Sequence, residues 1–175
     1  MPQGGRIAQM RHGWALNLVF AAALCMSGLA ATQVGNADRV VVFKSQRVLV
    51  LLKDGQEFRR YKIALGTSPV GPKTQLGDHK TPEGTYVIDS RNAASHFHRA
   101  LHISYPNAAD RERAAKLGVR PGGEIMIHGL PNGWGKIGET HLLRDWTDGC
   151  IAVTNEEIDE IWRLVQNGTP VEIKP

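Results

Sequence analysis

Short β-branched and leucine-rich runs constrain the fold more than any other feature of this sequence. Val40–Phe43 and Val48–Leu52 are two such runs, and with Lys44–Arg47 between them they predict a β-hairpin. Asp54-Gly55 is a strong two-residue turn signal before a third strand, where apolar residues alternate over Tyr61–Leu65. The chain is therefore expected to open on a β-meander.

Two helices are predicted among the later strands. Asn107–Leu117 is rich in alanine, alternates in charge and ends at Gly118. Thr154 and Glu157 form a capping box. The apolar residues that follow it at helical spacing are Ile158, Ile161, Trp162 and Val165. The further strands are expected at Thr85–Asp89, Ala100–Ser104, Glu124–His128 and Val171–Ile173. These patterns predict a mainly β domain with two short helices.

The N-terminus has the pattern of a secretory signal. Two arginines precede an apolar run over Trp14–Leu29, and small residues follow it. This run is shorter than the roughly 20 residues of a spanning helix, so we expect no stable membrane span. Cleavage is expected after Ala37, with Ala30 as the alternative. The sequence thus predicts a signal peptide over 1–37 and an exported domain over 38–175, periplasmic or associated with the cell wall.

The charge of this expected mature chain is small. Residues 1–37 carry two of the 21 basic residues and none of the 17 acidic ones, which leaves a net charge of +2. This value, without a cluster of lysines or arginines, argues against a nucleic-acid partner. A mildly basic protein is compatible with an anionic polymer of the cell envelope.

Cys150 is the only cysteine of the expected mature chain, because Cys25 lies within the signal. Exported proteins normally pair their cysteines as disulfides. A lone exported thiol is either a small buried apolar residue or a reactive group, and the count alone favours neither interpretation. The sequence around Cys150 decides between them.

Two segments predict the chemistry of the chain. Ile125–Gly129 ends a strand on His128, and Thr147–Ile151 places Gly149 directly before Cys150. A free thiol with a pKa of about 8.5 is mostly protonated at neutral pH, but a neighbouring imidazole can take its proton and leave an ion pair. Backbone N–H groups around Gly149 and Cys150 would form an oxyanion hole. We therefore predict that Cys150 is a nucleophile and His128 its general base.

The same segments resemble the L,D-transpeptidase catalytic domain, the YkuD family. The His-Gly strand end of the family corresponds to His128-Gly129, and its Ser/Thr-x-Gly-Cys segment corresponds to Thr147–Ile151. Asp159 and Ile161-Trp162 match its last helix, and Gly77–Tyr86 matches the turn before its central strand. The resemblance covers essentially the whole mature chain. It implies a mainly β, closed β-barrel-like fold with two or more short helices.

The resemblance also implies a peptidoglycan L,D-transpeptidase with a role in cell-wall biogenesis and cell shape. Cys150 would attack the third residue of a tetrapeptide stem, release D-alanine and form a thioester. An amine of another stem or of an envelope protein would then accept the acyl group, with His128 as proton donor and acceptor. Gly129, Thr147 and Asp148 would border the substrate. No metal and no organic cofactor are implied.

Two positions depart from the family pattern and leave the reaction open. The family usually has Arg two residues after the cysteine, where this chain has Ala152, and often has His in place of Asp148. Gly149–Thr154 resembles a branch that includes an enzyme detaching a lipoprotein from peptidoglycan. A cysteine hydrolase, either an L,D-carboxypeptidase or a peptidoglycan–lipoprotein amidase, is therefore the alternative function. A catalytically silent envelope-binding module fits poorly, because His128 and Cys150 are both present.

Further histidines and a long loop supply other candidate residues. His96, His98 and His102 would share a face if one strand ran through them, and a metal site is a minor alternative to contact with substrate. Gly129–Trp146 reads as a long irregular loop, and loops of this length are usually functional or disordered. We expect His98 and, from this loop, Arg144 to bind the stem peptide, with a solvated charge as the alternative for Arg144.

Overall fold

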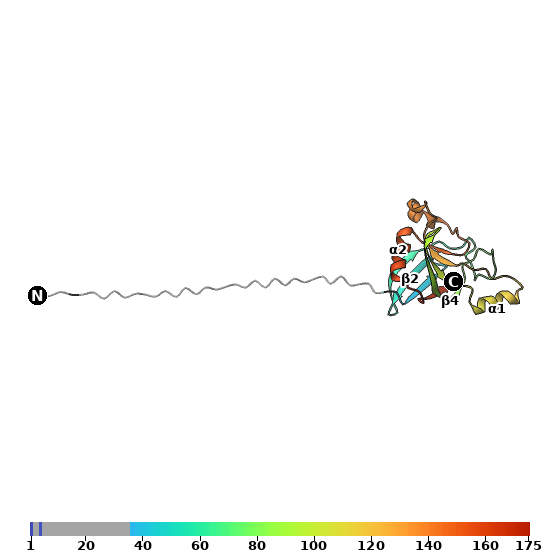
Figure 1. The fold of residues 1–175 in the computed structure, drawn as a ribbon, viewed down its shortest axis with the longest axis horizontal. Helices are drawn as coiled ribbons and strands as arrows, with labels where there is room; N and C mark the ends of the chain where they lie inside the picture. The colour runs from blue at the N-terminus through green and yellow to red at the C-terminus, as the bar shows by residue number, and fades with distance from the viewer. Residues whose placement is uncertain (2–3, 5–35) are drawn as a thin grey trace. The chain divides into compact units, whose positions relative to one another are not determined.

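The computed structural model describes Met1, Gly4 and residues 36–175, so the candidate signal run over Trp14–Leu29 lies outside the described residues. The elements follow in the order β1 (Arg39–Phe43), β2 (Val48–Lys53), β3 (Gln56–Lys62), β4 (Gly84–Ser95), β5 (His98–Ile103), α1 (Ala108–Lys116), β6 (Met126–His128), the 3₁₀ helix η1 (Gly135–Leu143), β7 (Ile151–Ala152), α2 (Asn155–Leu164) and β8 (Pro170–Lys174) (Figure 1). None of the helices in this part of the chain is long and apolar enough to cross a bilayer.

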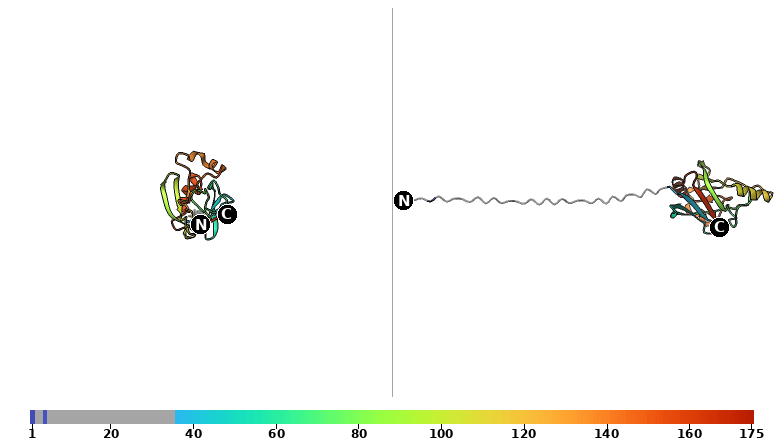
Figure 2. Two further views of the ribbon diagram at one scale, coloured as in Figure 1. Left: turned by 90° about the vertical axis from the view of Figure 1, so that its right-hand side faces the viewer. Right: turned by 90° about the horizontal axis from the view of Figure 1, so that it is seen from below.

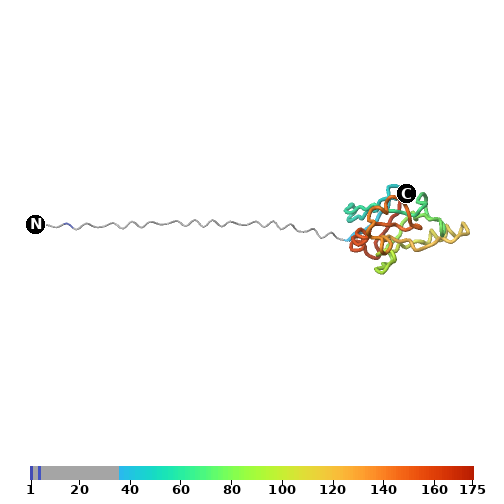
Figure 3. The backbone as a smooth tube through the Cα atoms, turned by 90° about the horizontal axis from the view of Figure 1, so that it is seen from above, coloured from blue at the N-terminus to red at the C-terminus, as the bar shows by residue number. Residues whose placement is uncertain are grey.

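The eight strands form one sheet in the order β3-β2-β1-β8-β4-β5-β6-β7. Neighbouring strands are antiparallel except for β1–β8 and β6–β7, which are parallel. Because β8 lies beside β1, the C-terminus reaches the turn between β1 and β2, as the trace in Figure 3 shows. There the Ser45 hydroxyl donates a hydrogen bond of 3.1 Å to the carbonyl oxygen of Pro175.

The sheet is open, so the expected closed barrel is wrong. Strands β3 and β7 form its two edges. Within residues 36–175 an isolated bridge links these edges at Ala64 and Ala152, through two N–H···O bonds of 2.9 Å. Since β3 ends at Lys62, before the bridge, and β7 has only two residues, no ladder of hydrogen bonds forms between the edges. The mainly β class and the short helices are confirmed.

Both predicted helices are present and each begins at a capping box, of which the sequence predicted only the one at Thr154. The Asn107 side chain accepts from the backbone of Asp110 at the start of α1, and Thr154 accepts from Glu157 at the start of α2. The apolar stripe of α2 is buried at Ile158, Ile161 and Val165, and the helix packs against β5. Helix α1, drawn in yellow, instead projects from one end of the domain (Figure 2).

The segment expected to be an irregular loop, Gly129–Trp146, contains the 3₁₀ helix η1. This helix is kinked at Gly138, whose φ of 47° and ψ of −134° are not helical. The sequence did not predict η1, because this segment is rich in glycine and its apolar residues follow no helical repeat. The loop then returns to the sheet, where the N–H groups of Trp146 and Thr147 both donate to the carbonyl of Leu65.

Candidate active site

Strands β6 and β7 bring His128 and Cys150 to one face of the sheet. In this parallel pair Ile127 lies beside Ile151, so extending the register by one residue places Cys150 beside Met126. Side chains alternate between the two faces of a strand. Ile127 and Ile151 are completely buried in the core, and the opposite face therefore carries Met126, His128 and Cys150. The two residues predicted to be catalytic therefore lie diagonally across the strand pair on this face.

The residue after His128 fixes the orientation of its ring. His128 Nδ1 lies 2.7 Å from the carbonyl oxygen of Gly129. Because a carbonyl oxygen only accepts, Nδ1 carries the proton and the neutral ring keeps Nε2 free to act as a base. Gly129 is itself buried, and a Cβ there would lie 2.7 Å from Oδ1 of Asn155, which already accepts the N–H of Leu130 at 2.9 Å. Gly129 therefore acts on His128 and has no room for a side chain.

Aromatic side chains surround the His128 ring. Its centroid lies 4.5 Å from that of Phe97, at the β4–β5 turn, and 5.8 Å from that of Trp146, at the end of the long loop. Trp146 Nε1 donates to Nδ1 of His141 at 3.4 Å, so the neutral His141 ring carries its proton on Nε2. This Nε2 is buried and has no hydrogen-bond partner in the described part of the chain.

Burial keeps His128 neutral. Its ring is 3% exposed, and the loss of solvation lowers its pKa from 6.5 to about 4, against a smaller opposing effect of the hydrogen bond to Gly129. The nearby His141 ring lowers the pKa of His128 slightly further. At pH 7 the imidazole is therefore a neutral base.

Cys150 is also neutral in the resting site. Its Sγ lies 3.4 Å from the carbonyl oxygen of Glu124 and can donate to it. Desolvation raises the pKa of the thiol, and the charges of Asp148 and Glu124 add to this effect. A backbone hydrogen bond from Met126 and the charge of Lys73 oppose it. The resting pair is thus a thiol and a neutral imidazole, which differs from the expected ion pair.

The Thr147 hydroxyl organises the turn before Cys150. It donates to the carbonyl oxygen of Cys150 at 2.8 Å and accepts the N–H of Gly149 at 3.1 Å. Thr147 is buried, so its role in this structure is to shape the turn. The Gly149 N–H, which was expected to donate to an oxyanion, already donates to the Thr147 hydroxyl. It would have to give up this hydrogen bond to bind an oxyanion.

Gly149 is required for steric reasons. Its φ is 127°, which side chains rarely allow, and a Cβ there would lie 2.6 Å from the carbonyl oxygen of Lys80. The adjacent Asp148 points outward with a side chain 91% exposed, and its Oδ1 lies 2.8 Å from His79 Nδ1. The turn that carries Cys150 is therefore pressed against the loop that precedes β4.

The other predicted substrate-binding residues lie apart from this turn. His98 Nε2 lies 3.0 Å from Oδ1 of Asp159 in α2, and the same carboxylate oxygen pairs with Arg99 at 3.1 Å. Asp159, which the sequence matched to the last helix of the family, therefore ties α2 to β5. Arg144 is exposed at the end of η1 and lines a cavity in the long loop.

The three histidines do not lie on one strand. β4 ends at Ser95 and β5 begins at His98, so His96 lies in the turn between them. His102 faces Asp89, with 2.6 Å between Nδ1 and Oδ1. Among the residues that the structure describes, no group of three or more His, Cys, Asp or Glu side chains is arranged to hold a metal.

Position 152, where the family usually has arginine, has room only for a small side chain in this structure. Ala152 is completely buried in β7 and forms the bridge to Ala64, which is also buried. An arginine side chain would have no space at this position unless the bridge changed. Ala152 therefore supports the edge of the sheet and offers no group to a substrate.

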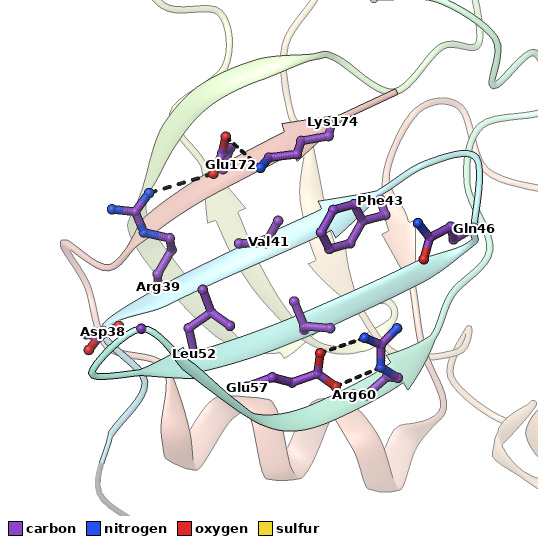
Figure 4. Close-up of a pocket in the computed structure, with 12 residues that line it drawn as sticks. Asp38, Arg39, Val41, Phe43, Gln46, Leu52, Glu57, Arg60, Glu172 and Lys174 are labelled. Atoms are coloured by element: carbon purple, nitrogen blue, oxygen red, sulfur yellow. Dashed lines mark hydrogen bonds and ion pairs between the residues drawn. The ribbon is translucent and has the colours of Figure 1, made fainter.

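One cavity lies near this face, and a second lies away from it. A cavity of about 570 Å³ adjoins the aromatic group around His128 and is lined by Leu130, Pro131, Trp134, Ile137, Thr140, His141, Leu143, Arg144 and Trp146. Another, of about 800 Å³, lies over β1, β2, β3 and β8 (Figure 4). On β8 Glu172 bridges Arg39 and Lys174, and the pair of Glu57 and Arg60 lies on β3, across β1 and β2. The two cavities share no lining residue, and only the first includes residues that contact the aromatic group around His128.

Comparisons with known proteins identify the family of this chain. A family model described as the L,D-transpeptidase catalytic domain (YkuD) matches residues 37–173. The putative L,D-transpeptidase YafK of Escherichia coli (strain K12) is 33% identical over 138 residues, which cover 75% of this chain and 48% of YafK. The chain thus spans about half the length of the curated relatives that it matches.

Two solved structures have a similar fold. The helical cell shape determining protein Pgp2 of Campylobacter jejuni superposes with a TM-score of 0.60 and 26% identity, covering 80% of this chain and 49% of Pgp2. Bd1075 of Bdellovibrio bacteriovorus superposes with a TM-score of 0.54 and 27% identity, covering 78% of this chain and 47% of Bd1075. Since the family model accounts for nearly all of the residues described, the chain belongs to the L,D-transpeptidase catalytic domain (YkuD) family.

Proposed function

We propose that this chain is a cysteine acyltransferase that acts on the tetrapeptide stems of peptidoglycan. The observation that carries the proposal is the placement of Cys150 and His128 diagonally across the strand pair on one face of β6–β7, with Nε2 of His128 free to take a proton. Family membership supports the peptidoglycan substrate. The export signal predicted from the sequence supports a location in the periplasm or at the cell wall, and the similarity to Pgp2 supports a role in cell shape.

The first half-reaction forms a thioester. Nε2 of His128 takes the proton from Sγ of Cys150 as the sulfur attacks the carbonyl carbon of the third stem residue. The resulting oxyanion needs N–H donors from the turn at Gly149 and Cys150. The carbon–nitrogen bond then breaks, His128 returns its proton to the departing amine, and D-alanine leaves.

The cavity beside Trp146 is suited to the stem that enters this reaction. Its lining is largely apolar but includes Arg144 and the buried Nε2–H of His141, which has no partner among residues 36–175. Both groups are donors and Arg144 is a cation, a combination that binds carboxylates. We assign the terminal carboxylate of the stem to these two residues.

The second half-reaction transfers the acyl group. His128 takes a proton from the incoming amine, the nitrogen attacks the thioester carbon, and Cys150 leaves as a thiol after proton return. Water in place of the amine would give hydrolysis. The observation that favours this second candidate is Ala152, which is buried where the family usually has arginine. The site then lacks one fixed positive charge that could orient a second stem.

The test incubates the protein with a purified disaccharide-tetrapeptide and identifies the products by mass spectrometry, with Cys150→Ala as the control. Cross-linked dimer lacking one D-alanine, formed only by the unmodified protein, would support transpeptidation. Tripeptide without dimer would support the hydrolase instead. Turnover by Cys150→Ala, or absence of turnover with this donor and with lipoprotein-linked muropeptide, would contradict both.

A further inference from the structure

A polar groove runs across the sheet from Cys150. Its volume is about 300 Å³, and its lining comes from three neighbouring strands and the segment before β6: Ser90, Asn92, Ala100, His102, Glu124 and Met126. Ser90 pairs with His102, and His102 pairs with Met126. Because Met126 lies beside Cys150, the row of side chains that forms the groove ends at the nucleophile.

Glu124 connects this groove to the thiol directly. Its carbonyl oxygen lies 3.4 Å from Sγ of Cys150. The backbone of Glu124 has a φ of 57°, a left-handed conformation that is uncommon for a glutamate. Its exposed carboxylate lines the groove and is close enough to the thiol to raise the pKa of Cys150. A fixed negative charge therefore stands in the groove beside the reacting sulfur.

The other charges near the groove leave that negative charge uncompensated. Asp89 adds a second carboxylate, whose Oδ1 lies 2.6 Å from Nδ1 of the lining residue His102. None of the lining residues is lysine or arginine. Lys73, a cation close enough to affect the pKa of Cys150, is committed to Asp78 at 2.6 Å. A groove with this balance favours a cationic ligand that can donate hydrogen bonds.

We propose that the groove of Ser90, Asn92, His102 and Glu124 is a subsite for a primary ammonium group on a diamino acid side chain, with Glu124 as its direct partner. The inference rests on the proposed function, since stem peptides that contain a diamino acid supply such a group near the reacting bond. The ammonium can belong to the acyl donor or to the acceptor. In either case Glu124 selects substrates whose side-chain amine is unmodified.

Equilibrium binding tests the subsite without turnover. The full chain carrying Cys150→Ala is titrated calorimetrically with a tetrapeptide stem, as donor, and a tripeptide stem, as acceptor, each with a free or N-acetylated side-chain amine. Acetylation should weaken binding about tenfold, the effect of losing one charge-assisted hydrogen bond. Adding Glu124→Gln should abolish this difference, whereas the matched Glu112→Gln change on α1 should preserve it. Equal unfolding temperatures of the two variants check that both remain folded.

The two ligands identify the source of the ammonium. A penalty for acetylating the tetrapeptide assigns the group to the donor, and a penalty confined to the tripeptide assigns it to the acceptor. An acetylation penalty that is absent, or that persists in Glu124→Gln, overturns the subsite. Failure of the unmodified protein to release D-alanine would contradict the proposed function. The binding titrations need no turnover, so they test the subsite separately.

Discussion

Acidification should destabilise this protein through the same burial that makes His128 a neutral base. His128 is 3% exposed and its pKa falls from 6.5 to about 4 in the folded protein. Between these two values the unfolded chain binds a proton at this histidine and the folded chain does not. The free energy of unfolding therefore falls as the pH falls through this window.

The size of the effect follows from the two pKa values. A shift of one pKa unit corresponds to about 1.4 kcal/mol, so lowering the pH from about 7 to about 4.5 should remove about 2 kcal/mol through His128 alone. The His128→Gln variant lacks this titration. Its stability should therefore fall by about 2 kcal/mol less than that of the unmodified protein over the same interval.

Urea unfolding at the two pH values, followed by circular dichroism, measures the difference. His96→Gln is the matched control, because His96 is exposed in the β4–β5 turn. His141 is also buried with a lowered pKa, but it contributes to all three proteins. Equal pH dependence in the unmodified protein and His128→Gln would refute the reasoning, because it would mean that His128 titrates as a solvated histidine.

Three further changes test the packing around the site and the start of the domain. Gly149→Ala should destabilise the folded protein by about 1–3 kcal/mol, because the new Cβ would meet the Lys80 carbonyl. Gly123→Ala is the control for thermal unfolding and should not destabilise the protein, because a Cβ at Gly123 meets no other atom. Ala152→Arg should cost more than about 3 kcal/mol in urea unfolding, since it buries an unpaired cation; unchanged stability would contradict this packing. Ala37 is buried and donates to a backbone carbonyl at 2.8 Å, so N-terminal sequencing of exported protein should find Ala37 retained and cleavage nearer Ala30.

The local elements could be predicted from the sequence because their signals are local. The hairpin at Lys44–Arg47, the glycine that follows α1 at Gly118 and the capping box at Thr154 depend on residues a few positions apart, and all three are present. The β4–β5 turn at His96 was missed because it contains neither glycine nor proline. Helix η1 was missed because its apolar residues follow no helical repeat.

Pairing between distant segments limited the prediction of the site. His128 and Cys150 were found from their own motifs, but the positions of Glu124, Asn155 and Phe97 around them depend on contacts across the fold. The neutral resting pair depends on burial, which local sequence does not reveal. The open sheet likewise follows from where β3 ends and how short β7 is, and a family resemblance does not determine either length.

The most direct test of the central claim is the mass of the intact protein after brief mixing with a tetrapeptide stem. The account predicts a transient adduct equal to the stem without D-alanine, located on the peptide that contains Cys150. The adduct should be absent in Cys150→Ala and should form at least 100-fold more slowly in His128→Gln, a typical cost of losing a general base. Release of D-alanine by Cys150→Ala, or an adduct on any other residue, would contradict the claim.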